Sequence, residues 1–139
     1  MAWAWGHFAA APMSRKEAML IVVDAANVVG SRPDGWWRDR AGAARRLLMR
    51  LSTLGLAQPA EVVVVLEGAA KAAGSEEFEG VRVVLADGSG DDAIVDVVAA
   101  ATEKDTITVV TADRGLRERI EALGAESVGP RWLLDRIDP

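Results

Sequence analysis

Four short apolar runs, each followed by a helix-like or turn-rich stretch, constrain the fold of this chain more than any other feature. The runs are AMLIVVD (18–24), EVVVVL (61–66), VRVVL (81–85) and ITVVT (107–111). Mainly apolar runs of this length are typical of strands that are buried in a parallel sheet. Because helices are expected between them, the strands should be joined by right-handed crossovers into a mostly parallel sheet. A fifth, shorter strand is expected at 125–128.

The connecting stretches show helical spacing of their apolar residues. Helices are predicted over 36–51, 91–102, 115–123 and 130–137. The first has apolar residues at intervals of three and four, and Gly55 closes it or the loop after it. The second is entered through a Gly–Ser–Gly turn, and the last begins at Pro130, a favoured first helical residue. The pattern therefore predicts an α/β fold.

The first 17 residues do not match this pattern. Arg15 and Lys16 follow the apolar part of the segment, whereas a secretory signal carries its positive charge first. Residues 1–17 are therefore expected to form a loosely ordered extension, and 18–139 a single domain. No uncharged apolar run is long enough to span a membrane, so the cytoplasm is the expected location.

Composition excludes several kinds of chemistry. The chain has no cysteine and one histidine, His7, which rules out disulfides, thiolate catalysis, the usual zinc sites and Ser–His triads. The formal net charge of −5 argues against a nucleic-acid binder unless the acids gather at one place. Six acids are candidates for such a cluster, and without them the charge would be +1: Asp24, Glu67, Asp91, Asp92, Asp96 and Asp113.

Five of these acids lie where predicted strands end or the following helices begin. Asp24 ends the first strand, Glu67 follows the second, Asp91 and Asp92 open the helix after the third, and Asp113 lies just past the fourth. In a parallel sheet all of these positions share the carboxyl edge, where open α/β sheets bind ligands. The alternative for any single acid, Asp91 above all, is a helix cap or a turn.

A cluster of carboxylates favours a hard cation. Asp96 lies one turn after Asp92 and shares its helix face. Clustered carboxylates repel each other unless they protonate or bind a cation, and without His or Cys that cation would be Mg²⁺ or Mn²⁺. One or two such ions suit the attack of water at phosphorus, which requires no histidine.

Four segments carry a family resemblance. IVVDAANVVG (21–30), VVVVLEG (62–68), GDDAIVD (90–96) and VVTADRGL (109–116) resemble, in this order, the NYN domain family of the PIN-like nuclease superfamily. The resemblance extends from about residue 18 to residue 137. It implies a three-layer Rossmann-like fold with five strands in the order 3-2-1-4-5. It also implies metal-dependent cleavage of RNA.

The resemblance assigns roles by position. Asp24 and Asp92 match the main metal-binding acids of the family, and Asp113 and Asp96 match two further acidic positions. Asp91 is a further candidate metal ligand. Asn27 would orient Asp24 or contact substrate, and Thr111 would place a hydroxyl beside the site. Two departures are visible: Glu67 stands where Asp is commoner and would reach the metal through water, and no second acid follows Asp113.

Candidate substrate-binding residues lie near these acids. Arg38, Arg46 and Arg50 share a predicted helix face, which is either a stripe for RNA phosphates or an ordinary solvated face. Trp36 could stack a base, whereas Trp37 lies on the predicted apolar face and could pack instead. Arg114, directly after Asp113, is a candidate phosphate ligand.

These features together predict a Mg²⁺- or Mn²⁺-dependent ribonuclease. Two alternatives remain open: a metal-dependent nucleotide pyrophosphohydrolase or other small phosphate-ester hydrolase, and a non-catalytic module that binds RNA or protein. The expected partner is RNA, with no membrane. The apolar cluster of Trp132, Leu133, Leu134 and Ile137 indicates either core packing or a homodimer contact.

Overall fold

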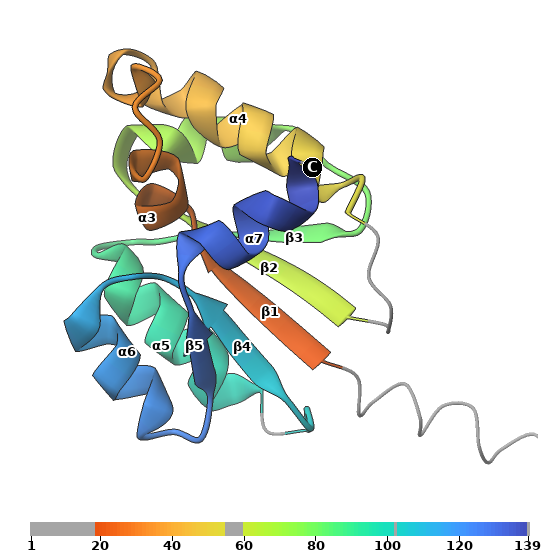
Figure 1. Cartoon of the computed structure of the whole chain (residues 1–139), viewed down its shortest axis with the longest axis vertical. Helices are drawn as coiled ribbons and strands as arrows, with labels where there is room; N and C mark the ends of the chain where they lie inside the picture. The colour runs from red at the N-terminus through yellow and green to blue at the C-terminus, as the bar shows by residue number, and fades with distance from the viewer. Residues whose placement is uncertain (1–18, 55–59, 102, 139) are drawn as a thin grey trace, which may run out of the picture.

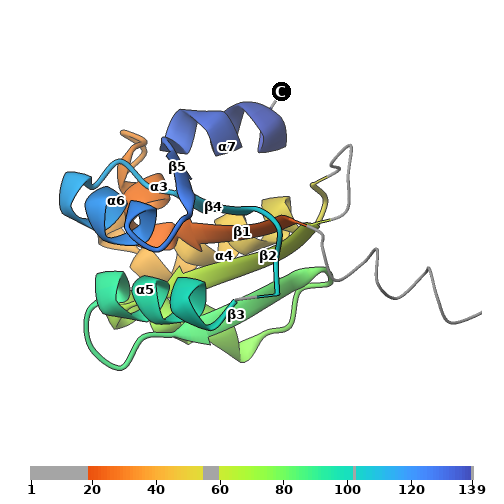
Figure 2. The same cartoon turned by 90° about the horizontal axis from the view of Figure 1, so that it is seen from below.

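A single parallel sheet forms the centre of the molecule (Figures 1 and 2). The computed structural model describes residues 19–54, 60–101 and 103–138, so the predicted extension and Gly55 lie outside the described residues. The strands are β1 (Met19–Asp24), β2 (Ala60–Leu66), β3 (Val81–Leu85), β4 (Ile107–Val110) and β5 (Glu126–Val128). All neighbouring pairs are parallel, and the order is β3-β2-β1-β4-β5. This confirms the predicted fold class and strand order.

Helices cover both faces of the sheet and make three layers. One face carries α3 (Ala25–Gly30), α4 (Arg40–Leu51), the 3-10 segment η3 (Gly68–Ser75) and α7 (Pro130–Ile137). The other carries α5 (Gly90–Ala100) and α6 (Arg114–Glu121). Figure 1 shows the two groups on opposite sides of the strands. None of the helices in the described part of the chain has the length and apolarity needed to cross a membrane.

Alternate residues of the central strands supply the two halves of the core. Ile21 and Val23 of β1 face the α4 side, whereas Leu20 and Val22 face α5 and α6. This alternation follows from the two-residue period of a strand, and it explains why the strand sequences are apolar throughout. Leu133 of α7 is fully buried in the first cluster, so the apolar residues of that helix pack into the core.

Two elements were missed by the sequence prediction, and one was extended too far. The helix α3 follows β1 without a loop, because Asp24 is both the last strand residue and the helix N-cap. The alanine-rich η3 lacks apolar periodicity. The helix predicted from residue 36 begins instead at Arg40, because Asp39 caps it by accepting a hydrogen bond from the Gly42 amide at 2.9 Å. Ahead of it lies a short 3-10 turn, η2 (Trp36–Arg38).

This later start changes the expected surroundings of both tryptophans. Trp37 was predicted to lie on the apolar face, but it is 53% exposed. Trp36 is half-buried, and its ring lies against Gly30 at the end of α3. The two rings meet edge to face. Because the residues of η2 are not in the phase of α4, the apolar face of the helix does not extend back to Trp37.

Candidate functional site

The carboxyl edge of the sheet brings together side chains from three strands. Asp24 ends β1, Glu67 follows β2, and Thr111 follows β4. Since β1 lies between β2 and β4, Asp24 is central to this edge. The chain leaves β1 toward one face and β4 toward the other, as expected at a topological switch point.

Asp24 is the buried centre of the site. It is 8% exposed, and its Oδ2 accepts a hydrogen bond from the Thr111 hydroxyl at 2.8 Å. Its Oδ1 accepts a longer hydrogen bond, 3.4 Å, from the backbone amide of Asn27. Burial raises the pKa of Asp24 to about 6, although both hydrogen bonds oppose the rise; the negative charges of Asp91 and Glu67 add to it. A buried carboxylate of this kind favours a neighbouring cation.

Thr111 connects Asp24 to the start of α6. Its side chain is buried, and its oxygen also accepts a hydrogen bond from the Asp113 amide at 3.1 Å. Asp113 then caps α6, because its Oδ1 accepts from the Leu116 amide at 2.9 Å. One hydroxyl therefore fixes the relative positions of two acids.

Replacing Thr111 by Val is expected to lower the free energy of unfolding by about 1–3 kcal/mol in EDTA. The substitution keeps the shape of the side chain but leaves an Asp24 oxygen and the Asp113 amide without their partner. Chemical denaturation would measure the loss. Thr108→Val is the matched control, because Thr108 is also buried and the described part of the chain shows no side-chain hydrogen bond for it. Equal losses in the two variants would contradict this role.

Asn27 supports the loop after β4 through its side chain. Its Oδ1 accepts a hydrogen bond from the Ala112 amide at 2.8 Å, while its backbone amide donates to Asp24. The Asn27 backbone amide therefore contacts Asp24, while its side chain joins α3 to the β4–α6 loop.

Glu67 holds the beginning of α5 against the end of β2. Its Oε1 accepts a hydrogen bond from the backbone amide of Gly90, the first residue of α5. A Cβ atom at position 90 would overlap this carboxylate, so the glycine permits the close approach. The N-cap of α5 is Ser89, whose hydroxyl accepts from the Asp92 amide at 3.1 Å, so Asp91 is not needed as a cap.

The two adjacent acids of α5 have different environments. The pKa of Asp91 is raised by partial burial and by the nearby charges of Asp113 and Glu67, and Asp91 in turn acts on Asp24. Asp92 is 70% exposed in its side chain and pairs with Arg119 of α6 at 3.0 Å. The structure thus brings Asp91, rather than Asp92, into the negative field around Asp24.

The remaining predicted site residues are more dispersed. Asp96 and Arg114 are exposed, and neither has an ion-pair partner among the described residues. Arg38 lies over the Trp37 ring, 5.7 Å from its centroid, whereas Arg46 lines a separate pocket between α3, α4 and α7. Within the described ranges, no three Asp, Glu or His side chains stand close enough together to form a ready-made metal site.

A pocket of about 460 Å³ adjoins the site on the α4 side. It is lined by Glu67 and Ser89 from the acidic edge and by Trp36 and Arg40 from the other wall. The Arg40 guanidinium lies over the Trp36 ring, 5.3 Å from its centroid. Trp36 thus lies beside the acidic edge, whereas Trp37 does not line this pocket.

The family model of the YacP-like NYN domain matches residues 21–139, which is the whole chain beyond the first 20 residues. The chain belongs to this family. Its members fall within the PIN-like nuclease superfamily that the four sequence segments indicated, and the predicted family membership is confirmed.

A solved structure shows the same fold. The crystal structure of a single-substitution mutant of Rae1 (YacP) from Bacillus subtilis superposes with a TM-score of 0.63 and 21% sequence identity. The match covers 86% of this chain and 74% of that chain. At this identity the likeness establishes the fold alone. No curated protein sequence matches this chain.

Sequence reasoning on this YacP-like domain missed two supporting groups. Ser89 as the α5 cap and Arg119 as the partner of Asp92 were not singled out. A serine three residues before an acid at a helix start is a capping signal that could have identified Ser89. Arg119 had no such signal, since its contact with Asp92 depends on how α6 packs beside α5.

Proposed function

We propose that this YacP-like NYN domain is a ribonuclease that uses Mg²⁺ or Mn²⁺ to hydrolyse phosphodiester bonds. The observation that carries the proposal is the buried Asp24 carboxylate at the switch point of the sheet, surrounded by the charges of further acids. Family membership supports the nuclease class.

The donor set fits a hard divalent cation. The available ligands are carboxylate oxygens, and burial together with negative neighbours makes an ionised Asp24 unfavourable without a counter-charge. Asp24, Asp91 and Asp113 would hold the ion, and Asp92 could join them only by leaving its ion pair with Arg119. When bound, the ion would lower the pKa of a coordinated water and neutralise charge on the phosphate.

The chain's own residues position the acids and the substrate. Thr111 holds Asp24 in place, Glu67 fixes the start of α5, and Asn27 fixes the loop that leads to Asp113. Arg114, exposed at the first position of α6, would bind a phosphate oxygen. The aromatic face of Trp36 in the adjoining pocket would stack a base of the RNA.

Asp91→Asn is expected to reduce RNA cleavage more than Asp92→Asn does. Asp91 shares the field of Asp24, Asp113 and Glu67, whereas Asp92 faces Arg119. A loss of at least about tenfold in kcat/KM is expected for Asp91→Asn, in the range of changes that disturb metal ligation. The measurement is the initial rate of Mn²⁺-dependent cleavage of a labelled single-stranded RNA.

The paired variants carry the same change of charge at adjacent positions, so each controls for the other. A larger loss in Asp92→Asn would mean that the α5 acids exchange roles when the ion binds. If the unmodified protein shows no Mn²⁺-dependent cleavage, the ribonuclease proposal is rejected. In that event, pyrophosphate release from a panel of nucleoside triphosphates would test the small-substrate alternative.

Two further expectations belong to the proposal. The protein would act in the cytoplasm, where its RNA substrate is found, and a homodimer would form through residues outside the packed face of α7. Sedimentation of the purified protein would test the second.

A further inference from the structure

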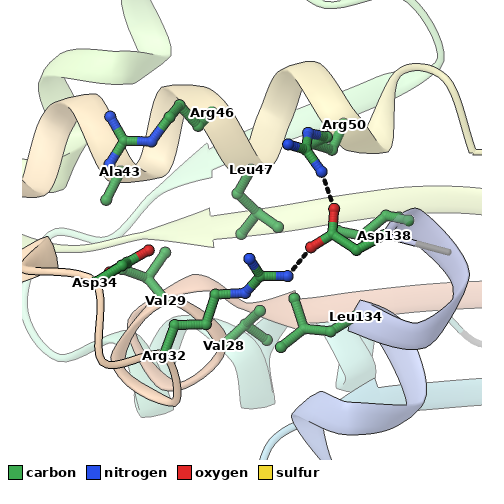
Figure 3. A pocket seen from close by; sticks show the side chains of 11 residues that line it. Val28, Val29, Arg32, Asp34, Ala43, Arg46, Leu47, Arg50, Leu134 and Asp138 are labelled. Carbon is green, nitrogen blue, oxygen red and sulfur yellow. Dashed lines mark ion pairs between the residues drawn. The ribbon is translucent and has the colours of Figure 1, made fainter.

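A small pocket away from the acidic edge is lined by three arginines (Figure 3). Its volume is about 90 Å³, and it lies between α3, α4 and α7. Arg46 and Arg50 are one turn apart on α4, and Arg32 enters from the segment after α3. The side chains of Val28 and Leu47 make its walls apolar. Charged guanidinium groups around a small apolar recess are a typical arrangement for binding an anion.

One carboxylate forms ion pairs with two of the three guanidinium groups. Asp138, directly after α7, forms ion pairs with both Arg32 and Arg50, as Figure 3 shows. Each arginine receives only one oxygen, and the buried Oδ1 that faces Arg50 has no aligned hydrogen bond to any described residue. The carboxylate therefore neutralises the two arginines without the parallel, two-bond geometry that guanidinium groups can form.

The third arginine has no carboxylate partner in the described part of the chain. Arg46 lines the same pocket, together with Asp34 on its rim, and neither residue forms an ion pair within the described ranges. A phosphate group has more oxygens than the Asp138 carboxylate and could accept from several guanidinium groups at once. The pairs that it would replace are partly exposed, with side-chain exposures of 39% for Arg32 and 57% for Arg50. Such pairs contribute little to stability.

A groove adjoins this pocket and reaches the neighbours of the acidic edge. Its lining includes Arg32 and Asp138, together with Asn27 and Ala112, which are hydrogen-bonded to each other beside Asp24. Leu134 and Asp138 line both the groove and the arginine pocket. A strand lying in the groove would contact Arg32 and pass Asn27 and Ala112, which lie next to the acidic edge.

We propose that Arg32, Arg46 and Arg50 form a binding site for a phosphate group, and that Asp138 holds two of these arginines when no phosphate is bound. The source that the groove favours is a backbone phosphate of the RNA strand, an assignment that rests on the proposed ribonuclease function. Inorganic phosphate offers the same chemistry and serves as the second probe.

Removal of the Asp138 charge tests the displacement. Binding of a labelled single-stranded RNA is measured in EDTA with Asp24→Asn as the parent, so that no cleavage occurs. Asp138→Asn is expected to tighten binding by about fivefold, because phosphate no longer competes with the carboxylate. The control is Glu76→Gln, which removes one charge from the ion pair with Arg45, also on α4. It is expected to change binding less than about twofold.

Removal of an arginine tests the site itself. Arg46→Gln is expected to weaken RNA binding by about tenfold. It should also reduce the slope of log binding constant against log salt concentration by about one, as loss of one phosphate contact predicts. Arg45→Gln removes the same charge one residue earlier on α4 and is the matched control. Inorganic phosphate, titrated against the arginine side-chain NMR signals, should shift those of Arg46 and not those of Arg45.

The outcomes separate the two phosphate sources and the two proposals. A response to inorganic phosphate alone supports the site and assigns it to free phosphate. The phosphate site is overturned if Arg46→Gln binds both probes as Arg45→Gln does and Asp138→Asn binds RNA as Glu76→Gln does. If the protein shows no Mn²⁺-dependent cleavage but phosphate binding still depends on Arg46, the ribonuclease proposal is overturned and the phosphate site remains supported.

Discussion

Asp24→Asn is expected to lower kcat/KM for RNA cleavage by at least about 100-fold in Mn²⁺. Asp24 is the central acid of the edge, and the amide removes the charge that would hold the cation while keeping the side chain's shape. Thr111 can still donate its hydrogen bond to the amide oxygen, so the fold should be retained. Initial rates over a range of RNA concentrations would measure the effect.

Asp105→Asn is the matched control for this experiment. Asp105 is exposed and precedes β4, at the edge of the sheet opposite to the site. The same change of charge there should leave kcat/KM within about twofold, since exposed charges far from the reaction are screened by salt. Similar rates for Asp24→Asn and Asp105→Asn would exclude Asp24 from the reaction.

The metal-free protein is expected to lose about 2 kcal/mol of stability between pH 4 and pH 7 because of Asp24. Burial raises the pKa of this carboxyl from 3.8 to about 6 in the folded state. Between these two values the folded state binds more protons than the unfolded state, so the free energy of unfolding falls as the pH rises. Chemical denaturation in EDTA across this range would measure the loss.

Asp24→Asn should remove this part of the pH dependence. The variant carries no titrating group at position 24, so at pH 7 it should be more stable than the unmodified protein in EDTA. Asp92→Asn should give no such gain, because Asp92 pairs with Arg119 at the surface. An unchanged pH profile in Asp24→Asn would show that burial of this carboxylate has no energetic cost.

The strand and helix pattern was predictable because it depends on local periodicity. The predicted ranges 81–85 and 130–137 coincide with β3 and α7, and each of the other strands differs from prediction by one residue at one end. Apart from the missed η3, which lacks apolar periodicity, the main errors occurred where a local cap overrode the pattern. Asp39 starts α4 later than the apolar spacing suggests, and Asp24 starts α3 inside what resembles a loop.

The pairing of the acids could not be predicted in the same way. Asp91 and Asp92 are adjacent in sequence and point in directions about 100° apart on a helix. Which of them faces Asp24 depends on the rotation of α5 about its axis. That rotation is set by the packing of Ile94 and Val98 on the sheet and by the contact of Gly90 with Glu67.

By itself, the sequence determined the α/β fold, the family and the set of acids at the carboxyl edge. Buried strands and helix starts can be predicted from local runs of residues. Only the tertiary structure decided that Asp24 is buried beneath Thr111, that Asp92 faces Arg119, and that Asp138 closes an arginine pocket. Each of these contacts joins residues at least 27 positions apart. Such contacts depend on the orientation of packed elements, which local sequence patterns do not encode.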